Sequence, residues 1–118
     1  MTTPIYRVKA DFFKVLAHPA RIRILEILRD GERSVGDLVP EVGIESSHLS
    51  QQLGIMRRAN LVQSRKEGST VFYSVGNKEL FDLLDVARAI ITSSLSESQG
   101  LLDELRAEGT SAVGTEAT

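Results

Sequence analysis

The spacing of hydrophobic residues changes along this chain, and that change limits the folds open to it. Between residues 61 and 75, LVQSRKEGSTVFYSV has two β-prone arms, Leu61–Arg65 and Thr70–Val75, on either side of Glu67-Gly68-Ser69. Such arms around a glycine-containing turn predict a two-stranded hairpin with a charged tip. Before and after this segment, hydrophobic residues recur at helical spacing. We therefore expect a mainly α fold with one small β-hairpin.

Four helices are expected before the hairpin. Their end signals are His18-Pro19, where proline suits a first helical turn, Ser34 as an N-cap, and Asn60 as a left-handed C-cap. The helices are expected at about residues 6–16, 19–29, 35–42 and 45–59.

A long helix is expected after the hairpin. Asn77 is its expected cap, and its hydrophobic stripe begins at Leu80 and continues to about Arg106. Residues 1–5 are expected to be a flexible N-terminus, and residues 6–107 to form one domain. The small and polar residues 108–118 are expected to be a disordered tail.

Composition restricts the broad class of protein. The chain has 118 residues, no cysteine, and no apolar run long enough to span a membrane. No signal-peptide core stands at the N-terminus, so a cytoplasmic protein is expected. Residues 1–75 carry 11 Lys/Arg and 8 Asp/Glu, whereas residues 76–118 carry 3 and 8. A basic face toward a polyanion is compatible with this asymmetry.

The fourth expected helix has an unusual distribution of polar groups. Its sequence is ESSHLSQQLGIMRR, in which Leu49, Leu53 and Met56 mark a buried face. Arg57 and Arg58 close the helix, and uncharged hydrogen-bonding side chains crowd its first turns. These side chains are Ser46, Ser47, His48, Ser50, Gln51 and Gln52.

Two short helices joined by a tight turn form a helix-turn-helix unit, whose second helix enters the DNA major groove with its N-terminal part. Ser, His and Gln can bond base edges there, and glutamine suits adenine. Arg57 and Arg58 are expected to pair with phosphates or with nearby acidic groups. The hairpin would act as a wing, in which Arg65, Lys66 and Ser69 contact DNA and add salt-dependent affinity.

With these elements in order, the chain resembles the ArsR/SmtB family of bacterial winged helix-turn-helix repressors over about residues 6–96. The most specific segment is Ser47–Leu53, where family members carry a Ser-x-x-Ser motif before a leucine. The resemblance implies the winged order α-α-α-α-β-β-α and repression at a partly palindromic operator. It rests on FFKVLAHPARIRILEIL (12–28), SVGDL (34–38), SSHLSQQLGIMRRANLV (46–62) and EGSTVFYSV (67–75).

The resemblance also implies a homodimer built mainly from the first and last helices. The sequence supports a dimer independently, because the stripe from Leu80 to Leu105 has more apolar surface than the last helix of a small domain can hide. Two recognition helices would then meet successive major grooves about 34–36 Å apart. The expected interface residues are Phe12, Phe13, Leu84, Ala87, Ile91, Leu95 and Leu102.

The chain lacks the sensing motifs most associated with the family. SVGDLV has no cysteine and the last helix has no histidine, so the metal-, sulfide- and oxidant-sensing mechanisms do not transfer. No cofactor and no metal is expected, and the sequence identifies no small-molecule effector. His18 is interpreted as a turn or cap residue, and Asp82 with Asp85 as a solvated acidic face.

Two other classes of function remain as alternatives. An enzyme is disfavoured, because the chain has no cysteine nucleophile, no phosphate-binding loop and no credible Ser/His/Asp set. A winged-helix module that binds only protein, or one that senses a non-metal ligand, is the second alternative. The cations Arg57, Arg58, Arg65 and Lys66 favour DNA over a partner that is only protein. We therefore expect double-stranded DNA and a second copy of the chain as partners, without membrane association.

Overall fold

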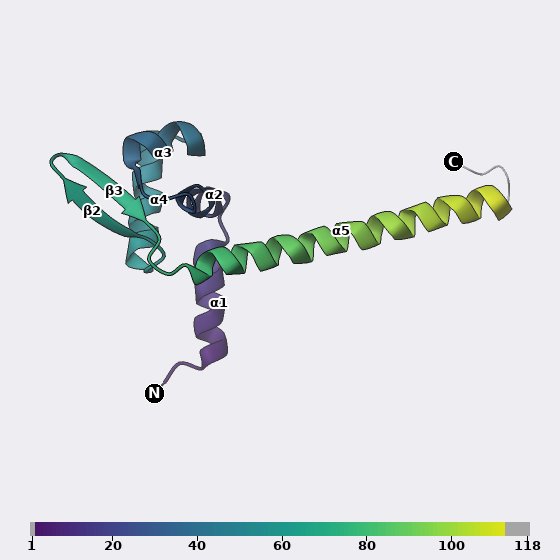
Figure 1. Cartoon of the computed structure of the whole chain (residues 1–118). Helices are drawn as coiled ribbons and strands as arrows, with labels where there is room; N and C mark the ends of the chain where they lie inside the picture. The colour runs from purple at the N-terminus through teal and green to yellow at the C-terminus, as the bar shows by residue number, and fades with distance from the viewer. Residues whose placement is uncertain (1, 113–118) are drawn as a thin grey trace. The chain divides into compact units, whose positions relative to one another are not determined.

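The computed structural model describes the backbone of residues 2–112 and the side chains of residues 2–107. The expected order of four helices, a hairpin and a last helix is confirmed, and the chain divides into two compact units between Phe81 and Asp82. The elements are α1 (Ile5–Leu16), α2 (Pro19–Leu28), β1 (Arg33–Ser34), α3 (Val35–Val42), α4 (Ser46–Arg58), β2 (Gln63–Glu67), β3 (Thr70–Ser74) and α5 (Glu79–Ala112) (Figure 1).

Three of the helices begin at the caps that the sequence predicts. His18 precedes α2, Ser34 precedes α3, and Asn77 precedes α5. Each side chain accepts a hydrogen bond from a backbone N–H two or three residues further on, at 3.2, 3.1 and 2.9 Å respectively. Because the first N–H groups of a helix have no partner inside it, these bonds fix where each helix starts.

The sheet has three strands, not the two that the sequence predicts. β2 and β3 form the expected antiparallel hairpin (Figure 1), closed by Gly68-Ser69 between the paired residues Glu67 and Thr70. Gly68 has a φ of 63°, which glycine adopts without strain. β1 pairs with the other edge of β3, so the strand order is β1-β3-β2. A strand of two residues has no alternation of its own and leaves no hydrophobic signal.

The hydrophobic core of the first unit lies among α2, α3, α4 and the segments beside the sheet. Burying each large apolar side chain contributes about 1.5–3 kcal/mol. Leu49, Leu53 and Met56 of α4 are fully buried, and this determines which face of α4 looks outward. The buried hydrophobic residues are Leu16, Ile24, Leu25, Ile27, Leu28, Leu38, Leu49, Leu53, Met56, Leu61, Val62, Val75, Leu80 and Phe81.

The ends of the described chain differ in part from the expectation. α1 begins at Ile5, and α5 continues to Ala112, beyond the expected end near Arg106. Residues 108–112 of the predicted tail belong to this helix, and residues 113–118 lie outside the described residues. The domain boundaries stay predictions. Within residues 2–112, none of the helices combines the length and the apolar character that crossing a membrane requires.

Candidate nucleic-acid interface

The turn between α3 and α4 is short and is shaped by a glycine. Gly43 has a φ of 80° and ends α3 while its N–H donates to the carbonyl of Val39 at 3.0 Å. Glu45 is the N-cap of α4, so the first helical residue is Ser46. The side chain of Glu45 makes no capping hydrogen bond. Two helices joined in this way form the helix-turn-helix unit that the sequence predicts.

α4 buries one face and exposes the other. Its buried face is fixed by the three fully enclosed apolar side chains of the core. The predicted polar set lies on the exposed face with the exception of Gln52. The exposed members are Ser46, Ser47, His48, Ser50 and Gln51.

Gln52 was predicted to contact DNA, but it lies on the buried face of α4. Its side chain is 5% exposed, and its amide is already engaged inside the protein. Its Oε1 accepts a hydrogen bond from Arg21 Nε at 2.7 Å, and its Nε2 lies 3.3 Å from His48 Nε2. A buried amide with these partners cannot reach a base edge. Its position between Leu49 and Met56 at helical spacing was a signal in the sequence that it belongs to the buried face.

The C-terminal end of α4 is closed by the left-handed residue that the sequence predicts. Asn60 has a φ of 61°. Its N–H donates to the carbonyl of Arg57 at 3.0 Å, and the N–H of Leu61 donates to that of Met56 at 2.9 Å. These two bonds make a Schellman motif. Arg57 and Arg58 are exposed in the last turn, and neither forms an ion pair within the part of the chain that the structure describes.

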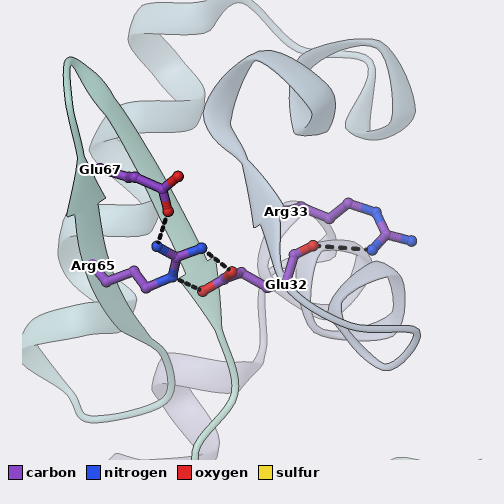
Figure 2. Close-up of polar contacts among 4 residues, drawn as sticks. All are labelled: Glu32, Arg33, Arg65 and Glu67. Atoms are coloured by element: carbon purple, nitrogen blue, oxygen red, sulfur yellow. Dashed lines mark hydrogen bonds and ion pairs between the residues drawn. The ribbon is translucent and has the colours of Figure 1, made fainter.

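Arg65, predicted to contact DNA, is held by two carboxylates within the protein. Figure 2 shows its guanidinium between the side chains of Glu32 and Glu67. Arg65 donates from Nε and one terminal nitrogen to the two oxygens of Glu32, both at 2.7 Å, and from the other to Glu67 at 2.6 Å. The guanidinium also lies over the ring of Phe72, 4.5 Å from its centroid. Arg65 therefore ties the hairpin to the segment before β1.

These contacts also change the ionisation of the groups. The hydrogen bonds from Arg65 lower the pKa of Glu32 below its ordinary value. The hydrogen bonds to Glu32 and then to Glu67 raise the pKa of Arg65. The positive charge of Arg65 is thus compensated locally. Lys66 and Ser69, the other predicted wing residues, are exposed, and Lys66 makes no ion pair among the described residues.

The two histidines of the chain border one shallow hollow of about 370 Å³ between the starts of α2 and α4. His18, Arg23 and His48 are its polar lining residues, and no carboxylate lines it. Throughout residues 2–107, no three His, Asp or Glu side chains gather into a group that could hold a metal ion.

Exposed apolar side chains are concentrated on α1 and α5. Of the predicted dimer residues, Phe12, Phe13, Ile91, Leu95 and Leu102 are exposed large hydrophobics, Ala87 is exposed, and Leu84 is half-buried. The rings of Phe12 and Phe13 meet edge to face with their centroids 5.5 Å apart. Further exposed residues that the sequence analysis did not name as interface residues are Ile5, Tyr6, Val8, Val86, Ile90, Leu101 and Leu105.

Comparison with known proteins gives consistent matches. The sequence model of the family described as "Bacterial regulatory protein, arsR family" matches residues 18–64. The uncharacterized HTH-type transcriptional regulator Rv0081 of Mycobacterium tuberculosis is 51% identical over 107 residues, which cover 90% of this chain and 94% of that protein. Its crystal structure aligns with a TM-score of 0.75 over 82% of this chain and 98% of the other.

Two more distant relatives extend the likeness. The biofilm growth-associated repressor of Agrobacterium fabrum is 40% identical over 81 residues, 69% of each chain. The solution structure of the homodimeric winged helix-turn-helix DNA-binding domain Mb0332 from Mycobacterium bovis is 25% identical. It has a TM-score of 0.69 and covers 79% of this chain and 86% of that one. The fold described above is that of the two solved structures, Rv0081 and Mb0332.

Proposed function

Because the chain belongs to the arsR family of bacterial regulatory proteins, we propose that it is a homodimeric repressor of transcription that binds a palindromic DNA operator. It is a transcriptional regulator and not an enzyme. The observation that carries the proposal is the exposed polar row of α4, on a helix whose opposite face is fully enclosed in the core. Acting on an operator, it would work in the bacterial cytoplasm, where the chromosome lies.

The base sequence of the operator would be recognised by the exposed first turns of α4. Base edges and nearby phosphates would be contacted by Ser47, His48, Ser50 and Gln51. Ser46, at the start of the helix, would contact the DNA backbone. Glutamine can bond N6 and N7 of adenine together, so Gln51 is the strongest candidate for discriminating one base pair.

Affinity that does not depend on sequence would come from exposed cations at two places. Phosphates would pair with Arg57 and Arg58 at the end of α4 and with Lys66 on β2. Ser69, at the hairpin turn, would add a contact to the DNA backbone. Arg65 would act mainly as a brace that holds the wing, because its guanidinium already bonds Glu32 and Glu67.

A second copy of the chain would cover the exposed apolar residues of α1 and α5. Exposed apolar side chains at this density mark an association surface. A two-fold dimer presents the same surface twice, so its operator would have two related half-sites in inverted order. The homodimeric state of the Mb0332 domain supports this assembly.

Selection of bound duplexes from a random pool tests the proposal. The wild-type protein should enrich an inverted repeat. Q51A should lose about 1–3 kcal/mol of binding free energy and tolerate any base at one position of each half-site. The control variant S96A removes an exposed polar side chain from α5, off the helix face that carries Leu95 and Leu102, and should enrich the wild-type sequence. A pool that shows no enrichment at low salt would contradict the proposal.

A further inference from the structure

Three polar side chains form a row that joins α2 to the exposed start of α4. Arg21 donates from Nε to Gln52 Oε1 at 2.7 Å, and Gln52 Nε2 lies 3.3 Å from His48 Nε2. A terminal nitrogen of Arg21 donates to the carbonyl of Val15 in α1 at 3.0 Å. The row starts at the end of α1 and finishes at an exposed residue of the proposed recognition surface.

The chemistry of this row permits only one arrangement of protons. A guanidinium has donors and no acceptor, so the atom of Gln52 that faces Arg21 must be the amide oxygen. The amide nitrogen then faces His48, and it can only donate. His48 Nε2 must therefore accept. A neutral imidazole that accepts at Nε2 carries its proton on Nδ1.

Burial makes the arrangement difficult to reverse. The side chain of Gln52 is 5% exposed, so water does not replace a lost partner. Turning the amide by 180° would point its NH₂ group at the N–H of Arg21 and leave both donors without an acceptor, which is costly in a buried position. The Val15 carbonyl holds Arg21 in place from its other side.

We propose that Arg21 and Gln52 are positioning residues that fix the tautomer of His48, so that His48 presents an Nδ1–H donor to a hydrogen-bond acceptor of DNA. The inference rests on the proposed function for its DNA partner. Acceptors of this kind are purine N7, guanine O6, thymine O4 and phosphate oxygens, whereas the amino groups of adenine and cytosine are donors and are rejected. Two residues that touch no DNA thereby set what a third can recognise.

The free protein gives the first test, because the tautomer of each imidazole is visible in long-range ¹H–¹⁵N NMR spectra recorded in alkaline buffer. His18 is an internal reference. Its Nδ1 accepts from the N–H of Ala20 at 3.2 Å, so its proton lies on Nε2. The two histidines should show opposite tautomers, and H18N, which keeps a capping side chain, assigns the signals. A His48 with its proton on Nε2 would overturn the proposal without any variant.

Q52E gives the second test. The glutamate is nearly the same shape and still accepts from Arg21, but its second oxygen accepts where the amide nitrogen donated. His48 should move its proton to Nε2. The matched control Q51E adds the same charge to the same helix at an exposed position and should leave the tautomer of His48 unchanged. A His48 that keeps its proton on Nδ1 in Q52E would also overturn the proposal.

Binding to a selected operator gives the third test. Replacing single purines by their 7-deaza analogues removes an N7 acceptor. Putting 2-aminopurine in place of guanine removes O6, putting 5-methyl-2-pyrimidinone in place of thymine removes O4, and methylphosphonate linkages remove a phosphate acceptor. In the same alkaline buffer, one such change should weaken the wild-type protein about tenfold and leave Q52E unaffected. Equal losses for both proteins at every position would contradict the DNA-facing role of His48. A protein that binds no duplex while its tautomers are as stated would remove the proposed function and leave the positioning of His48 intact.

Discussion

Replacing Lys66 with alanine is expected to weaken the salt dependence of DNA binding without changing the preferred sequence. Lys66 lies on β2 opposite Val71, close to the hairpin turn, and is exposed. The positive charge of its neighbour Arg65 is compensated by ion pairs with Glu32 and Glu67. Lys66 is therefore the cation of the hairpin best placed to neutralise a phosphate.

The size of the effect follows from counterion release. Each phosphate that a protein neutralises contributes about 0.9 to the slope of log K against log salt concentration. A homodimer has two copies of Lys66, so the slope should become shallower by about 1.8 in K66A. Between about 50 and about 200 mM salt, the wild-type protein should then lose roughly tenfold more affinity than the variant.

Fluorescence anisotropy titrations of a labelled duplex at several salt concentrations measure this slope. K14A is the matched control, because Lys14 is an exposed lysine in the last turn of α1, outside the proposed DNA-binding surface. Its slope should equal that of the wild type. If K66A and the wild-type protein give the same slope, Lys66 contacts no phosphate, and the assignment of the hairpin as a DNA-binding wing is refuted.

Two further predictions concern assembly and stability. Ile91 is 59% exposed on α5, and I91E should shift the protein from dimer to monomer in sedimentation velocity, because a carboxylate at the interface would be buried without a partner. An unchanged association constant would argue against an α5 interface. Hydrogen bonds from Arg65 lower the pKa of Glu32 from about 4.5, so Glu32 stabilises the fold above that pH and its contribution disappears as the pH falls through the lowered value. Urea midpoints should therefore be higher for the wild type than for E32Q at neutral pH and should converge in acid; equal midpoints at both pH values would contradict the role of the pair.

Much of the fold could be predicted because its signals are local. The caps at His18, Ser34 and Asn77 and the left-handed Asn60 are each determined by side chains and neighbours within a few residues. The helical spacing of α4 also identified its buried apolar face. Such features depend on the intrinsic chemistry of short segments and do not require knowledge of tertiary contacts.

The features that the sequence did not reveal depend on partners distant in the chain. Arg65 and Glu32 are 33 residues apart, so no local pattern indicated that this cation was already paired. Gln52 and its partner Arg21 are separated by 31 residues. The prediction that Gln52 contacts DNA followed from its polar side chain, whereas its helical position indicated the buried face. β1 forms because Arg33 and Ser34 pair with an edge of β3. The two residues alone carry no pattern that predicts a strand.

A hydroxyl-radical footprint of the wild-type protein on a selected duplex tests the central claim most directly. If two copies of the chain set two α4 helices into consecutive major grooves, the footprint should contain two protected segments on one face of the duplex, with centres about 10–10.5 base pairs apart. A single protected segment, or protection with no such spacing at low salt, would contradict the account.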